Sequence, residues 1–279
     1  MVKQKHSAFD IIIKYMPLTG ILERTGSAIW PYISNILDMS TLFLESFKVG
    51  LSKHGRGDKM VFNVVMNQIL FTGVEAIKIV AVIALLLGGV TIIETISLVP
   101  DMGGESLIGK ILVVVVVREL GPIITAFIVI GRSGTAISTE IGYMMVNHEI
   151  QALEMMGINP MRYVVFPRIV GMSVAVFCLS FVFNMVALFG GHLVARLIIH
   201  YPFALYLDDL SRALGFWDVA VSGIKCFFFG IIVAVICCYQ GFSVKFSFTE
   251  IPQVATRAVV WSIYACFAVN IIITAFFYI

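Results

Sequence analysis

Charged side chains are scarce in this chain. Only 13% of its 279 residues are Asp, Glu, Lys or Arg, whereas 59% are hydrophobic. A soluble domain usually carries about a quarter charged residues, so this composition excludes a soluble globular protein. The mean hydropathy of +0.99 predicts a membrane protein with several spans. The formal net charge of only +2 argues against a nucleic-acid partner.

Several motifs of enzymes and metal sites are absent as well. The sequence holds no G-x-x-x-x-G-K-[ST], no H-E-x-x-H and no G-x-S-x-G, so we expect neither ATP binding nor an enzyme active site on this chain. Its cysteines lie in apolar runs without metal-ligand spacing, and we expect no metal and no cofactor. The basic start of the chain lacks a small-residue cleavage site, which argues against a signal peptide.

What the chain has instead is long apolar runs. Five of them can cross a membrane at about 1.5 Å of helix per residue: about 76–99, 107–131, 163–194, 219–239 and 257–279. The predicted fold is therefore an all-α integral membrane protein with a transmembrane domain over 61–279. Residues 61–75 are semi-polar and are expected to enter along the membrane interface.

Residues 1–60 are predicted to form a separate cytoplasmic and interfacial region. Within it, the polar and apolar residues from Ser27 to Gly50 alternate with helical spacing. This amphipathic helix would lie in the membrane interface or pack on another subunit. Basic residues concentrate before the first span and in the second and fourth loops, so the positive-inside rule places the N-terminus in the cytoplasm and the C-terminus outside.

Two adjacent charges interrupt the second apolar run, Arg118 and Glu119. Each charge near mid-membrane costs about 2.5–3.5 kcal/mol on insertion scales. They would either join neighbouring helices or subunits, or line a cavity open to water or lipid headgroups. Adjacent helical residues point about 100° apart, so the two are not expected to face one narrow seam. The following Gly121-Pro122 pair predicts a kink.

The sequence also predicts contacts for several other residues in or beside the spans. Glu94 would either reach the outer interface or face the same cavity as Glu119, and Glu75 would pair with Lys78 three residues later. Small residues in the stretch GRSGTAISTEIG predict close helix packing at Gly131, Gly134 and Gly142.

The stretch EIGYMMVNHEIQALEMMGINP, residues 140–160, is partly apolar and partly acidic. It predicts a short cytoplasmic helix over about 143–157 that either docks into a groove on a soluble partner or lies in the interface. Gly157 and Pro160 supply the end signal. The docking residues would be His148, Glu149, Leu153, Glu154, Met155, Met156 and Gly157, with His148 as a surface contact and not a metal ligand.

The central motifs RELGP, GRSGTA, EIGYM, HEIQALEMMG and NPMRYVVFPR resemble the MlaE/YrbE permease family, the membrane subunits of MCE-type ABC lipid transporters. The closing stretch CYQGFSVKFSFTEIPQVATRAVVW is similar to the end of that family, and the resemblance covers about residues 60–279. Two departures are that FSFTEIPQVAT replaces a glycine-rich loop and that His148-Glu149 stands where the family has Glu-Gln.

The resemblance implies a homodimeric permease of the inner (plasma) membrane. A phospholipid would bind in a cavity between the two copies, near Glu94, Arg118, Glu119, Gly121 and Pro122. A cytoplasmic ABC ATPase would bind under the 143–157 helix, and an MCE-domain protein on the outer face. Two alternatives remain: a proton-coupled secondary transporter or channel that uses Glu94 or Glu119, and a membrane scaffold that transports nothing.

Overall fold

The computed structural model describes residues 34–50, 58–102, 107–199, 202–245 and 247–278, and these contain helices joined by short turns, with no strand among them. The chain divides into two compact units, Met1–Glu45 and Ser46–Ile279. The expectations for residues 1–33 and 51–57, including the start of the amphipathic helix, lie outside the described residues.

The first unit is represented by the beginning of a helix over residues 34–50. Its apolar side chains Ile36, Leu37 and Leu44 are exposed. The Ser40 and Thr41 hydroxyls donate to helix carbonyls one turn back. An exposed apolar face suits either a membrane interface or another subunit, and the interfacial placement stays a prediction.

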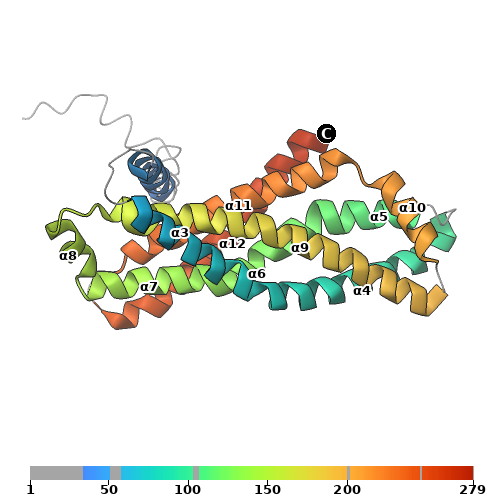
Figure 1. Cartoon of the computed structure of the whole chain (residues 1–279), viewed down its shortest axis with the longest axis horizontal. Coiled ribbons are helices and arrows are strands. Elements are labelled where there is room, and N and C mark those ends of the chain that lie inside the picture. Colours follow the sequence, from blue (N-terminus) through green and yellow to red (C-terminus); the bar gives the residue numbers. More distant parts are fainter. Residues whose placement is uncertain (1–33, 51–57, 103–106, 200–201, 246, 279) are drawn as a thin grey trace, which may run out of the picture. The chain divides into compact units, whose positions relative to one another are not determined.

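The second unit is built from long helical runs, with α8 at one end and α5 and α10 at the other (Figure 1). Several runs contain π or 3₁₀ turns, which are labelled η. In chain order the elements are α3 (Asp58–Thr72), η1 (Val74–Ala76), α4 (Ile77–Met102), α5 (Leu107–Leu112), η2 (Val113–Leu120), α6 (Gly121–Val129), η3 (Ile130–Gly134), α7 (Thr135–Val146), α8 (Glu149–Met155), η4 (Met161–Val165), α9 (Phe166–Ile199), α10 (Phe203–Ala213), α11 (Phe216–Phe242), η5 (Phe248–Glu250) and α12 (Ile251–Tyr278).

Five helical runs in the described residues are long and apolar enough to cross a membrane, which confirms an all-α membrane protein. They are Lys59–Ser97, Gly109–Val146, Met161–Ile198, Phe216–Phe242 and Phe248–Phe277. All five runs extend beyond at least one expected end, the first, second and fifth most of all, and the fifth begins at Phe248 where about residue 257 was expected. The first includes the semi-polar residues 61–75, and the second continues past residue 131 to Val146.

Ion pairs between helices accompany these longer runs. Arg132 pairs with Glu75, and its Nη1 donates to the Phe71 carbonyl oxygen over 2.7 Å, near the end of α3. The sequence had suggested Lys78 as the partner of Glu75, and that assignment is wrong because the arginine arrives from a helix distant in sequence. Arg168 Nη2 lies 2.8 Å from Glu140 Oε1 in the same way. Pairing of this kind lets polar residues remain within a helix that the sequence alone would end.

Glycines allow the tightest approach in the unit, between α4 and α9. A Cβ at Gly88 would lie 2.0 Å from the Ala187 carbonyl oxygen, and one at Gly190 would lie 2.9 Å from that of Leu85. Backbones therefore meet directly along this seam. Among the glycines expected to pack, Gly134 and Gly142 do lie against neighbouring helices, whereas a Cβ at Gly131 would meet no heavy atom within 4 Å.

Candidate functional site

A polar cluster joins three helices around Glu119 in the second span. The Lys225 ammonium of α11 lies 3.0 Å from Glu119 Oε1, and the Thr274 hydroxyl of α12 donates to the same oxygen over 3.1 Å. Asn270 Nδ2, also on α12, donates to Oε2 over 2.8 Å. Lys225 is fully buried, while the Glu119 side chain keeps 33% of its surface exposed. A buried ammonium inside a span needs such a partner, so Glu119 and Lys225 depend on each other.

Arg118 extends this cluster along the same helix. Its Nε lies 2.8 Å from Oδ1 of the buried Asp218, which also accepts from the Gly215 backbone N–H at the start of α11. Arg118 and Glu119 thus both bind α11, at positions about two turns apart. The expectation that they could not share one seam is wrong, because a long arginine side chain spans the distance that helix geometry puts between them.

Lys225 also supplies a hydrogen-bond donor that the helix lacks at Pro122. Pro122 has no N–H to offer the carbonyl oxygen four residues back, that of Arg118. That oxygen accepts a hydrogen bond from Lys225 Nζ over 2.9 Å. The π turn η2 ends immediately before Gly121, so the irregularity expected from Gly121-Pro122 takes the form of a change in helical winding. Gly121 has its own constraint, since a Cβ there would lie 2.2 Å from Asn184 Oδ1 of α9.

Glu94 was the other acid expected to face the same cavity as Glu119. Its side chain on α4 is exposed, and no hydrogen bond or ion pair among the described residues joins it to Glu119. Arg118, Glu119, Gly121 and Pro122 are neighbours in the second span, and the placement of Glu94 in the same cavity stays a prediction.

A second candidate surface is formed by α8 at the end of the unit (Figure 1). The range 143–157, expected as one helix, is divided: α7 ends at Val146, and His148 adopts a left-handed conformation with φ of 58° before α8 begins. Gly157, with φ of +75°, ends α8, and the Ile158 N–H donates to the Leu153 carbonyl oxygen as in a Schellman motif. Two left-handed residues thus fix a short helix that presents Met155 and Met156, 83% and 66% exposed.

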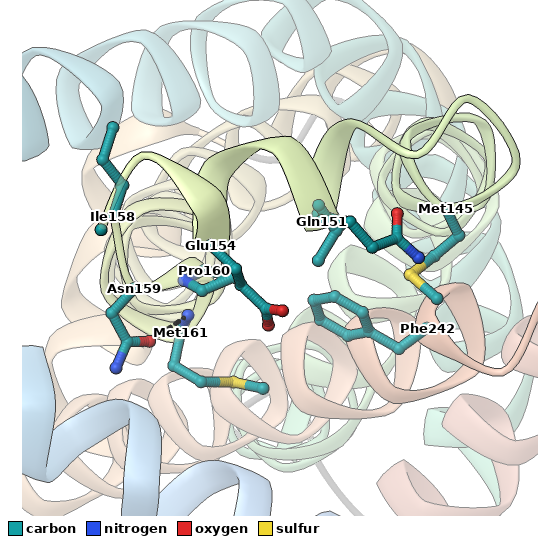
Figure 2. A pocket seen from close by; sticks show the side chains of 10 residues that line it. Met145, Gln151, Glu154, Ile158, Asn159, Pro160, Met161 and Phe242 are labelled. Carbon is teal, nitrogen blue, oxygen red and sulfur yellow. Dashed lines mark hydrogen bonds between the residues drawn. The ribbon is translucent and has the colours of Figure 1, made fainter.

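Two cavities flank α8. One, of about 560 Å³, is lined by residues of α7, α8, the turn that follows it, and α11; Figure 2 shows Glu154 and Gln151 of α8 with Phe242 of α11. The other, of about 660 Å³, lies among Glu149, Glu140, Tyr143, Tyr163 and neighbouring residues. The docking residues named from the sequence therefore lie on α8 or directly beside it, and α8 contributes residues to both cavities.

The C-cap geometry of α8 gives a first testable prediction. Replacing Gly157 by alanine forces a Cβ into a left-handed conformation and should cost about 1 kcal/mol. Hydrogen exchange of the α8 amides should then become about fivefold faster through local opening. Gly131→Ala is the matched control, because its Cβ meets open space in a helix. Unchanged exchange in Gly157→Ala would contradict the assigned cap.

Sequence reasoning missed the partners of Glu119. Lys225 is a single basic residue inside the apolar run FWDVAVSGIKCFFFGIIVAVICC, and the cost argument applied to Arg118 and Glu119 could have found it. Asn270 and Thr274 are uncharged, and their pairing with a residue more than a hundred positions away follows from no local rule.

Comparison with known proteins gives matches over most of the chain. The family described as "Permease MlaE" matches residues 65–276. The "Probable ABC transporter permease protein" of Rickettsia bellii is 28% identical over 219 residues, 78% of this chain and 85% of the relative. The "Intermembrane phospholipid transport system permease protein MlaE" of Haemophilus influenzae is 27% identical over 215 residues, 77% of this chain and 82% of the relative. The protein "TRIGALACTOSYLDIACYLGLYCEROL 1, chloroplastic" of Arabidopsis thaliana is 27% identical over 213 residues, 76% of this chain and 61% of the relative.

Proposed function

Because the chain belongs to the MlaE permease family, we propose that it is the membrane-spanning permease subunit of an ATP-driven phospholipid transporter. The observation that carries this proposal is the family match over residues 65–276, a range that reaches from α3 to α12. The name of the Haemophilus influenzae relative supplies the substrate class, phospholipid. The chain would be a multi-pass protein of the inner membrane, with its N-terminus in the cytoplasm and its C-terminus outside.

The power source in this proposal is a separate cytoplasmic ATPase. The sequence has no Walker-type phosphate-binding loop, so ATP must be bound by a partner. The surface best suited to that partner is α8, because its two left-handed ends fix its orientation and its tip exposes Met155 and Met156. Methionine side chains fit irregular apolar grooves.

The lipid path is proposed to run between two copies of the chain. Arg118 and Glu119 keep 28% and 33% of their side-chain surface exposed, while their partners Asp218 and Lys225 are buried. The exposed edge of this cluster would give the shared cavity a polar lining, and the buried partners would hold η2, α11 and α12 in place. An MCE-domain protein would receive or deliver lipid at the opposite end from α8.

A mechanism follows from the continuity of the second span. ATP-driven closure of the partner would push on α8, which contacts α7. The run from α7 back to α5 includes the π turns η3 and η2, where the winding of a helix can change. Movement would reach the Glu119 cluster through these turns and open or close the cavity around a lipid.

This proposal is tested by reconstitution in liposomes that contain a fluorescent phospholipid. The complex purified with its co-purifying ATPase should move the lipid only with hydrolysable ATP, and the chain alone should not move it. Lipid or proton movement by the chain alone would favour a secondary transporter or channel. Absence of ATP-dependent movement by an active complex would favour a scaffold.

A further inference from the structure

The segment around α8 is unusual in its charge. Residues 135–161 include Glu140, Glu149 and Glu154 but no lysine or arginine. The basic residues that the positive-inside rule expects of a cytoplasmic loop lie at the two ends of this segment, at Arg132 and Arg162, and not on α8. An acidic surface in that place suits a basic protein partner and repels an anionic lipid surface.

The three carboxylates differ in what they bind. Glu140 pairs with Arg168, and Glu149 accepts a hydrogen bond from Asn147 Nδ2 over 3.4 Å. The Glu154 side chain has no hydrogen bond or ion pair among the described residues. Glu154 is therefore the acid on α8 whose charge is available to a partner.

The surroundings of Glu154 restrict the kind of partner group. Figure 2 shows its carboxylate directed into the cavity, toward the Phe242 ring, with the Met161 side chain alongside. The cavity measures about 560 Å³, which is ample for one long side chain. A carboxylate, an aromatic ring and thioethers together suit a lysine or arginine, whose apolar stem packs on methionine while its charge meets the acid and the ring.

We propose that the ATPase subunit inserts a lysine or arginine side chain into the cavity beside α8, where Glu154 binds its charge. The inference rests on the proposed function, because the ATPase is the partner that function requires. Met155 and Met156 would enter the apolar groove of the partner, while the partner's cation enters the cavity of this chain. Each subunit would thus insert side chains into the other.

The test measures the affinity between the chain, held in lipid nanodiscs, and the ATPase that co-purifies with it, at several salt concentrations. Glu154→Gln should raise Kd at least about tenfold and flatten its salt dependence, since it removes one charge of a desolvated pair. Glu154→Asp should restore part of the affinity. The matched control is Glu250→Gln, which also removes one acidic charge, from η5 beside α7 and outside both cavities, and which should leave Kd almost unchanged.

Two results would overturn the inference: wild-type affinity in Glu154→Gln, or an equal loss in Glu250→Gln, which would indicate a diffuse charge effect. Thermal unfolding of each variant shows whether it is folded, and an exposed carboxylate should tolerate the change. If no ATPase co-purifies with the wild-type chain, the proposed function itself fails. The two failures are therefore distinct.

Discussion

Replacing Lys225 by methionine is expected to destabilise the folded chain by about 3–5 kcal/mol, because it leaves a charge without its buried partner. Glu119 would lose the ammonium 3.0 Å from its Oε1, and the Arg118 carbonyl oxygen beside Pro122 would lose its donor. Methionine keeps the length of the lysine stem, so the effect reports the charge more than the packing. Denaturant unfolding in mixed micelles measures the free energy of unfolding.

A double variant separates the contribution of the ion pair from the other effects of replacing Lys225. Glu119→Gln together with Lys225→Met removes both charges, and replacing a buried pair by neutral groups is often close to neutral. The double variant should therefore be more stable than Lys225→Met alone, which gives a clear coupling energy in a double-mutant cycle. Additive losses from the two substitutions would show that the pair is not the source of the stability.

Alanine at Gly88 is the second change for which we expect a large loss, about 2–3 kcal/mol in the free energy of unfolding. Its Cβ would lie 2.0 Å from the Ala187 carbonyl oxygen, and because a backbone atom cannot rotate away, α4 and α9 would have to separate. Thermal unfolding followed by light scattering measures the loss.

The control for Gly88→Ala is the same substitution at Gly131, where the added methyl group meets no atom within 4 Å. Alanine is favoured over glycine within helices, so Gly131→Ala should leave stability unchanged or slightly higher. If the two substitutions behaved alike, the close approach of α4 and α9 would not be a source of stability.

The sequence was sufficient for the class of fold because hydropathy acts locally. Each candidate span is an apolar run of sufficient length, so five runs could be counted without knowing how they pack. Helix ends were harder to place. Arg132 and Glu140 look like loop residues in isolation, yet each lies in a helix and is paired with a charge from another helix.

The candidate site was predictable in part for the same reason. The cost of a charge in the membrane identified Arg118 and Glu119, and the same argument applied to Lys225 would have found their neighbour. What the sequence did not contain was the pairing itself, since Glu119 meets Lys225, Asn270 and Thr274 only after three helices have packed. The division of the 143–157 range depended on the left-handed conformation of His148, which no neighbouring residue type demanded.

The hydrogen bond from Lys225 to the Arg118 carbonyl oxygen has a consequence for motion. A side chain that donates a hydrogen bond to a main-chain carbonyl of a neighbouring helix holds the two helices together at that level. Sliding η2 along α11 would expose an unsatisfied carbonyl in hydrocarbon, so the two should shift as one rigid piece during a transport cycle. Helices would then move relative to one another mainly at contacts that have no hydrogen bond of this kind.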